Sequence, residues 1–316
     1  MHIPAMTVLV TGASGFLGRA VVAELVRQGH TVRAGVRQLP GGDAWPAGVQ
    51  PVLCEVQSGA GLEPACAGAD AVIHLAAAMG GSAAEQEAVA VDGTRRLLAA
   101  MDGRCPRLLL ASSFAVYDWQ RAGATLDEDS AVLDEFGLAG QDAYAIAKVR
   151  QEALARTLCA ERGIALTVLR PALIWSHARR DLSCIGPGNA RLRLVMAPDR
   201  VLRLTHVDSC ASAFAAALDP RACGETLNID DATGITARQF AAASGVRLRV
   251  PVPLGLASAV AAVAAAVLTP VVGAARLPGL LVPARLNARF HRARAGHGAL
   301  ARLLGWQPPA AASRFT

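Results

Sequence analysis

A glycine-rich segment between an apolar strand and a helix places the strongest constraint on what this chain can fold into. Residues 11–18 read TGASGFLG, after a strand predicted over 7–11 and at the start of a helix predicted over 16–28. Glycines at these positions permit a tight turn, close approach of a pyrophosphate to backbone N–H groups, and close helix–strand packing. The N-terminus of the helix then attracts the phosphates. In this context the segment predicts dinucleotide binding rather than a merely structural turn.

The alternation of strand and helix continues through the first two-thirds of the chain. Short apolar strands are predicted over 31–36, 49–54, 71–76, 107–112 and 165–170, and helices over 84–101, 144–162 and 208–218. Apolar strands without a clean alternation, separated by helices, indicate a parallel sheet that is covered on both faces. We therefore expect an α/β fold with a doubly wound parallel (Rossmann) sheet. Residues 1–170 would form the dinucleotide-binding domain, 201–230 would return to it, and 171–316 would form a smaller, mostly helical substrate domain.

Composition excludes several classes of function. The 316 residues are 53% hydrophobic and 18% charged, which suits a folded chain with a large core. The seven cysteines are scattered and never occur as Cys-x-x-Cys, which indicates reduced thiols in a cytoplasmic protein without a zinc or other metal site. We expect no signal peptide, because the first apolar run is short and leads into glycines. With only 4% aromatic residues beside a net charge of +6, nucleic-acid binding has little support.

Residues 250–275 carry no charged side chain and are rich in alanine, valine and leucine. Their length would suit a membrane span, but alanine is only weakly apolar and prolines interrupt the run. We therefore predict a buried helix that lines a hydrophobic substrate pocket. An arginine cluster follows at Arg285, Arg289, Arg292 and Arg294, so peripheral docking on anionic lipid stays open. A homodimer is also left open.

The end of the second predicted strand bears on which dinucleotide is bound. NAD-binding proteins place an acid there for the ribose 2′-hydroxyl, whereas an arginine accommodates the 2′-phosphate of NADP. This chain has Arg33 and Arg37 at that place, and no acid before Asp43. The sequence therefore favours NADP over NAD, with Arg37 at the 2′-phosphate. The alternative is that Arg37 is a solvated loop charge.

Lys148 is the only lysine among 31 basic residues, and it stands four residues after Tyr144, one of two tyrosines. An ammonium differs from a guanidinium because it is compact and its pKa shifts readily. Four residues is about one helical turn, so both side chains share a helix face. An ammonium beside a phenol is expected to lower the phenol's pKa and prepare it for proton transfer. An isolated Tyr-x-x-x-Lys pattern would more often be coincidence, but here it lies downstream of a phosphate-binding turn.

Further short motifs follow the predicted strands. They are VIHLAA at 72–77, SSFAVY at 112–117, Arg170-Pro171, THVD at 205–208, GETLNI at 224–229 and LGWQP at 304–308. Together with the glycine segment and Tyr144-x-x-x-Lys148, they resemble the extended short-chain dehydrogenases/reductases of the NAD-dependent epimerase/dehydratase superfamily. The second strand and the apolar C-terminal third look most like its dihydroflavonol-reductase and 3β-hydroxysteroid-dehydrogenase branches.

The resemblance implies a role for each motif residue. Tyr144 would be the general acid, Lys148 would tune Tyr144 and hold the nicotinamide ribose, and Ser113 would hydrogen-bond the substrate oxygen, with Ser112 as the fallback. Glu55 matches the family's adenine-contacting acid. The residues expected to line the cofactor are Gly12, Ser14, Gly15, Phe16, Leu17, Gly18, Arg37, Glu55, Val56, Leu75, Ala76, Ala77, Ser112, Tyr144, Lys148, Pro171, Ala172, Leu173 and Ile174.

These observations predict an NADP-dependent oxidoreductase that reduces a ketone, or oxidises a secondary alcohol, of an apolar small molecule. One alternative is a nucleotide-sugar epimerase or dehydratase. Dehydratases that resemble this chain carry an acidic pair directly after the catalytic hydroxyl, whereas here Phe114 and Ala115 follow Ser113. A second alternative is a non-catalytic dinucleotide-binding or membrane-associated accessory protein, for which loss of the Tyr–Lys pair would be the usual sign.

Overall fold

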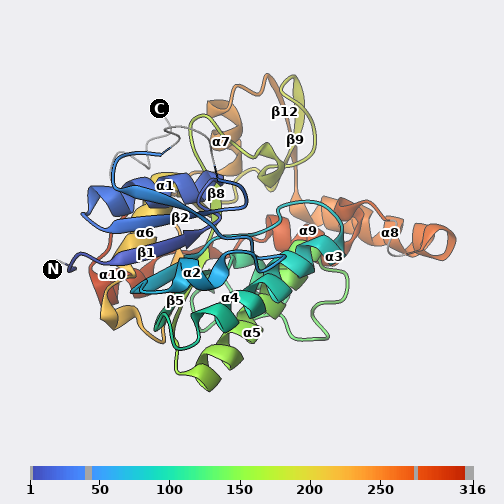
Figure 1. The fold of residues 1–316 in the computed structure, drawn as a ribbon. Coiled ribbons are helices and arrows are strands. Elements are labelled where there is room, and N and C mark those ends of the chain that lie inside the picture. The colour runs from blue at the N-terminus through green and yellow to red at the C-terminus, as the bar shows by residue number, and fades with distance from the viewer. Residues whose placement is uncertain (1–2, 40–44, 274–276, 310–316) are drawn as a thin grey trace.

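The computed structural model describes residues 3–39, 45–273 and 277–309, and a seven-stranded parallel sheet forms its centre (Figure 1). The strand order is β11-β7-β5-β4-β1-β2-β3. The strands are β1 (Thr7–Thr11), β2 (Thr31–Val36), β3 (Val49–Leu53), β4 (Ala71–His74), β5 (Arg107–Ala111), β7 (Ala165–Pro171) and β11 (Thr226–Ile229). This order reverses direction between β1 and β4, as in doubly wound folds that bind dinucleotides. The predicted fold class is confirmed.

Helices cover both faces of the sheet, because successive side chains of each strand point to opposite faces. Val8 and Val10 of β1 pack in one core cluster with α1 and α6, while Leu9 packs in the other with α4 and α5. The helices of this region are α1 (Phe16–Arg27), α2 (Leu62–Cys66), α3 (Ala83–Glu87), α4 (Gly93–Met101), α5 (Ala143–Arg162), α6 (Val207–Ala216) and α10 (Gly298–Leu304). The helix predicted over 84–101 contains a π-helical segment, η1 (Ala88–Asp92), between α3 and α4. The short 3₁₀ helices η2 (Phe114–Val116) and η4 (Pro220–Ala222) follow β5 and α6.

A smaller lobe, formed mostly by residues after β7, contains more strand than predicted. Three two-stranded parallel pairs join β8 (Leu173–Trp175) to β10 (Leu204–His206), β9 (Leu192–Met196) to β12 (Leu248–Val252), and β6 (Thr125–Leu126) to β13 (Arg294–Ala295). The helices of this lobe are η3 (Leu182–Cys184), α7 (Ala237–Ala243), α8 (Leu254–Val272), η6 (Gly279–Leu281) and α9 (Pro283–Phe290). The chain returns to the main sheet through α6 and β11, so the smaller lobe is built from separated stretches of the chain.

Helix α8 does not occupy the buried position predicted from the sequence. It extends away from the rest of the molecule on the right of Figure 1. Within the described residues it is the one helix long and apolar enough to cross a membrane by length and composition. In the window Leu254–Val271 only 6% of the residues are buried. The sequence interpretation was wrong here, because apolar composition alone does not distinguish a core helix from an exposed apolar one.

A buried polar network joins α5 to the sheet. The carboxylate of Glu152 accepts hydrogen bonds from Arg170 on β7 (2.5 Å), from Arg156 (2.9 Å) and from Ser112 Oγ after β5 (2.7 Å). Arg170 in turn lies 4.8 Å from the Tyr117 ring. Burial opposes ionisation of Glu152, but the hydrogen bonds and the positive charge of Arg170 hold its pKa below the usual value. The carboxylate is therefore ionised and fixes the position of α5.

We expect Glu152→Gln to lower the free energy of unfolding by about 3 kcal/mol, because it leaves the buried Arg170 cation without its counter-charge. Urea unfolding measures this change. Glu87→Gln is the matched control: it breaks the exposed pair with Arg150 (2.6 Å) and should cost less than about 1 kcal/mol. Equal effects of the two substitutions would contradict the assigned role of Glu152.

Candidate functional site

A large cleft opens at the carboxyl ends of the sheet strands. It has a volume of about 790 Å³ and lies between the main sheet and the smaller lobe. The glycine segment, the ends of β4, β5 and β7, and the start of α5 form one wall. Segments of the smaller lobe around Leu202, Leu280 and Ala288 form the other. Parallel α/β sheets bind their ligands in this crevice, at the point where the strand order reverses.

The glycine segment has the geometry that a close backbone approach requires. Gly12 has φ +68°, and a Cβ atom on it would lie 2.9 Å from the backbone nitrogen of Ala76. A Cβ atom on Gly18 would overlap the carbonyl oxygen of Gly12, so the helix and the turn are in contact there. Helix α1 begins after Gly15 without a side-chain cap, which leaves its first N–H groups directed at the cleft. These features fit a bound pyrophosphate.

The three candidate catalytic residues meet on the floor of this cleft. Ser113 and Tyr144 share a side-chain hydrogen bond. Lys148 is buried, and its ammonium donates to the carbonyl oxygen of Ala111 (2.7 Å) and to Gln151 Oε1 (2.9 Å). Its Nζ lies 5.9 Å from the centroid of the Tyr144 ring. A phenol, a hydroxyl and an ammonium thus surround one point beside the glycine segment.

The protonation of this group differs from the sequence expectation. Burial raises the pKa of Tyr144 above its usual value, although the bond with Ser113 acts in the opposite direction. Burial also lowers the pKa of Lys148 to about 8, although Glu152 acts in the opposite direction. The predicted lowering of the Tyr144 pKa by Lys148 is therefore not found, since the ammonium is bonded to Ala111 and Gln151. Tyr144 is therefore protonated at neutral pH.

A chain of buried, hydrogen-bonded polar residues leads to Lys148 and orients its side chain. Gln151 accepts from Lys148 and donates to Thr94 Oγ1 (2.9 Å), which also contacts His74 Nε2 (3.0 Å). His74 Nδ1 reaches Thr11 Oγ1 at 2.6 Å. Burial lowers the pKa of His74 to about 3, so it is neutral and joins β1, β4 and α4 rather than acting as a base. Sequence analysis missed Gln151, although its spacing of three residues from Lys148 places both on one helix face.

The structure brings most of the predicted cofactor residues to the cleft wall. Those that line it are Gly12, Gly15, Phe16, Leu17, Gly18, Leu75, Ala77, Ser112, Ser113, Tyr144, Lys148, Pro171, Ala172, Leu173 and Ile174. Ala76 lies in the turn behind Gly12, and Ser14 is exposed at the tip of the glycine segment.

Three other predicted residues lie away from the cleft lining. Arg37 is exposed at the end of β2. Val56 is buried in the core. The Glu55 carboxylate accepts the backbone N–H groups of Gln57 (3.1 Å) and Ser58 (2.9 Å). Although burial opposes it, these bonds and nearby Arg37 lower the Glu55 pKa. Glu55 thus stabilises its own loop in this structure.

Two arginines of the smaller lobe line the cleft and have no signal in the sequence. Arg203 lies 4.3 Å from the Trp119 ring, and Arg200 lies 5.5 Å from the Phe290 ring. Among the described residues, neither guanidinium has a carboxylate within ion-pair distance. Burial lowers the pKa of Arg203 to about 9, and it raises the pKa of nearby Asp230 to about 8. The substrate side of the cleft is therefore positively charged near neutral pH.

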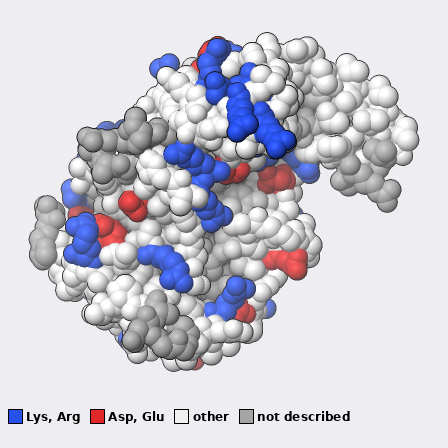
Figure 2. Space-filling view, turned by 90° about the horizontal axis from the view of Figure 1, so that it is seen from above, with Lys and Arg blue, Asp and Glu red and all other residues white. Residues whose placement is uncertain are grey.

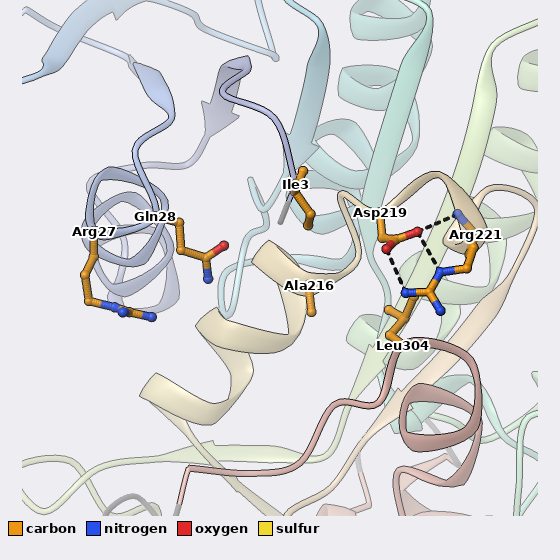
Figure 3. Close-up of a pocket in the computed structure, with 7 residues that line it drawn as sticks. All are labelled: Ile3, Arg27, Gln28, Ala216, Asp219, Arg221 and Leu304. Atoms are coloured by element: carbon orange, nitrogen blue, oxygen red, sulfur yellow. Dashed lines mark hydrogen bonds and ion pairs between the residues drawn. The ribbon is translucent and has the colours of Figure 1, made fainter. Parts of the chain in front are cut away.

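A second cavity of about 370 Å³ lies on another part of the molecule (Figure 3). Its charged groups already have partners: Arg221 pairs with Asp219 at 2.8 Å, and Arg27 pairs with Glu24 at 2.6 Å. Neither the glycine segment nor the Tyr–Lys pair reaches it. We assign it no chemistry.

The sequence confirms the family that this geometry indicates. Residues 8–229 match the sequence model of the NAD dependent epimerase/dehydratase family. The chain belongs to this family, whose members bind NAD or NADP and are typically oxidoreductases or epimerases.

Individual relatives match over different lengths. Three uncharacterised mycobacterial proteins, one from Mycobacterium bovis and two from strains of Mycobacterium tuberculosis, are 36% identical over 111 residues, which cover 33% of this chain but only 13% of their own length. A 2-alkyl-3-oxoalkanoate reductase from Stenotrophomonas maltophilia is 32% identical over 69% of this chain and 67% of its own. A short-chain dehydrogenase/reductase superfamily structure from Agrobacterium tumefaciens, with bound NAD, aligns with a TM-score of 0.68 at 22% identity. It covers 98% of this chain and 94% of its own, which supports the fold.

The lowered pKa of Lys148 predicts a specific dependence of stability on pH. The unfolded pKa of lysine is about 10.4, so between about pH 8 and that value the unfolded chain binds more protons than the folded one. Raising the pH in this window therefore favours the fold. We expect the stability of the wild type relative to Lys148→Met to grow by about 1 kcal/mol between pH 7.5 and pH 9. Urea unfolding at both values checks it, and a constant difference would contradict the lowered pKa.

Proposed function

We propose that this protein is an NADP-dependent oxidoreductase that reduces a ketone, or oxidises the corresponding secondary alcohol, with Tyr144 as the general acid or base. The observation that carries the proposal is the meeting of Tyr144, Ser113 and Lys148 beside the glycine segment. Family membership supports an enzyme that uses NAD or NADP.

The chain's own residues would bind the carbonyl and move one proton. Gly12, Gly15 and the N-terminus of α1 hold the cofactor's pyrophosphate. A bound nicotinamide cofactor supplies hydride to the carbonyl carbon, or accepts it in the reverse direction. Ser113 Oγ hydrogen-bonds the carbonyl oxygen, and Tyr144 Oη donates its proton to that oxygen. Solvent would return a proton to the Tyr144 phenolate, and the Lys148 ammonium would donate to the ribose of the bound nicotinamide.

The preference for NADP is supported by the charges at the end of β2. Arg33 donates to the carbonyl oxygens of Ala65 (3.0 Å) and Ala67 (2.6 Å), so its guanidinium is committed to the fold. Arg37 is exposed at the strand end and remains as the candidate for the 2′-phosphate. Asp43, the first acid after the second strand, lies outside the described residues.

The cleft supports a substrate that has an apolar body and an anionic group. Residues 250–273, the part of the charge-free segment that the structure describes, do not line the cleft, so this segment gives no support for an apolar substrate. Phe114, Trp119 and Leu202 provide apolar lining, and Arg200 and Arg203 add positive charge. The name of the Stenotrophomonas relative describes a substrate of this kind, an oxoalkanoate with an alkyl branch. A substrate panel should therefore pair each oxo acid with its neutral ester.

Tyr144→Phe removes the proton donor and should lower kcat by a factor of at least about 100. Tyr117→Phe is the matched control, because that buried phenol bonds Asn228 (2.7 Å) and does not line the cleft. NADPH consumption with the substrate panel measures both variants. Unchanged turnover of Tyr144→Phe would overturn the mechanism. Interconversion of nucleotide sugars by the wild type without net NADPH use would favour the epimerase alternative.

We expect NADPH to raise the melting temperature more than NADH does at equal concentration. Arg37→Gln should weaken NADPH binding about ten-fold and leave NADH binding unchanged, because only NADPH carries the 2′-phosphate. Arg27→Gln is the control, since this exposed arginine lies outside the cofactor cleft. A larger stabilisation by NADH would contradict the assignment of NADP.

A further inference from the structure

Helix α8 presents an apolar surface that nothing in the described structure covers. Leu256, Val260, Val263, Val267 and Val271 are between 55% and 80% exposed. Only a narrow side of the helix is buried, where Ala257 and Ala261 pack near Leu286 and Phe290 of α9. The mean hydropathy of the window Leu254–Val271 is 2.1.

Further exposed apolar side chains lie on the two strands that precede α8 in the smaller lobe. Thirteen large apolar side chains are exposed among the described residues, and eight of them belong to α8, β12 or β9. Leu248 and Val250 lie on β12, which leads directly into α8, and Leu192 begins β9 beside it. We call this set the α8 surface. A monomeric protein rarely exposes so large an apolar area without a partner for it.

The charge of the chain is divided unevenly along the sequence. Of the 31 basic and 25 acidic residues, ten basic and no acidic ones lie in residues 232–316. Residues 1–231 therefore carry 21 basic and 25 acidic groups, so the positive charge comes from the C-terminal part. In Figure 2 the lobe that projects on the right is free of blue and red, and basic side chains gather on the lobe beside it. Arg247, just before β12, and Arg249 on β12 are exposed, and β12 leads into α8.

This charge distribution distinguishes two possible partners of the α8 surface, a second copy of the chain and an anionic lipid bilayer. A second copy of the chain would bring two acid-free, positively charged segments together, and these would repel each other. A helix of a second copy would also cover only one face of α8, whereas α8 is apolar over most of its circumference. An anionic lipid bilayer suits both the apolar surface and the positive charge. Its hydrocarbon can contact every exposed apolar face of α8, and its headgroups complement the arginines.

We propose that the α8 surface docks on anionic lipid bilayers, with α8 in the boundary of the hydrocarbon layer and Arg247 and Arg249 at the headgroups. Helix α8 does not span the bilayer in this arrangement. Segment η6 packs back against α8 and leads into α9, so the chain on both sides of α8 belongs to the same body.

Flotation of the full chain with lipid vesicles tests the proposal. We expect binding to phosphatidylcholine–phosphatidylglycerol vesicles and much weaker binding to phosphatidylcholine alone, with a loss at high salt. Val263→Glu with Val267→Glu should reduce binding at least about ten-fold. Arg247→Gln with Arg249→Gln should reduce it about 30-fold on the anionic vesicles only.

Leu53→Glu is the matched control, because it also adds a carboxylate at an exposed apolar position but lies on β3. It should bind vesicles as the wild type does. Each variant should keep the wild-type circular dichroism spectrum and its thermal shift with NADPH, so a failure here is separate from a failure of the proposed function.

Failure to float with anionic vesicles would overturn the proposal. So would a concentration-dependent dimer in sedimentation velocity that Val263→Glu with Val267→Glu abolishes, in a protein that does not bind vesicles. That result would assign the surface to a second copy of the chain.

Discussion

The buried carboxylate of Glu152 is the interaction on which the candidate site depends. It receives Arg170 from the end of β7 and Ser112 from the end of β5, so it fixes α5 against the sheet at one register. Tyr144 and Lys148 precede Glu152 on the same helix by eight and four residues and therefore share its face. A shift of α5 by one residue would turn Tyr144 away from Ser113. A buried ion pair often gives little net stability compared with an apolar core, but it favours one arrangement over its alternatives. Here that arrangement is the one that forms the cleft floor.

The same network allows the fold to hold a lone ammonium in its interior. Lys148 lies among apolar strand ends, and its cost of burial is reduced by the Ala111 carbonyl and by Gln151. The neutral His74 beneath it adds no second positive charge. On the far side of the cleft, Arg200 and Arg203 extend the positive region. An anionic dinucleotide and an anionic substrate would both be drawn to such a cleft, and their charges would in turn raise the pKa of Lys148.

Local sequence patterns were sufficient to predict those parts of the structure whose residues are adjacent in the chain. The strand at 7–11, the glycine segment and the helix that follows are adjacent in the chain, so periodicity and turn chemistry predict them. The bounds of β1 and β2 agree with the prediction residue by residue. The Tyr–Lys pair was predictable for the same reason, since both residues lie on one turn of one helix.

The remaining features depend on contacts between distant segments. Arg200 and Arg203 reach the cleft only because β10 pairs with β8, and nothing near them in the sequence indicates this. Glu152 looks like an ordinary helical charge until Arg170 is placed beside it. The sequence prediction for α8 was wrong because its composition suits both a buried core helix and an exposed apolar helix. Only its packing, on one narrow side against α9, shows that the helix is exposed.

The position of α8 links the proposed membrane contact to the proposed chemistry. Leu280 packs on the α8 side of the smaller lobe and also lines the cleft, and Ala288 of α9 lines the cleft as well. A body docked through α8 would thus hold this wall of the cleft close to the headgroup layer. Molecules with an apolar body and an anionic group concentrate in that layer, because their two parts prefer its two sides. The arginines in the cleft and the apolar face of α8 would then select for the same property of the substrate. If both proposals hold, one wall of the cleft is shared with a segment that has no role in binding the cofactor because that wall faces the layer from which the substrate comes.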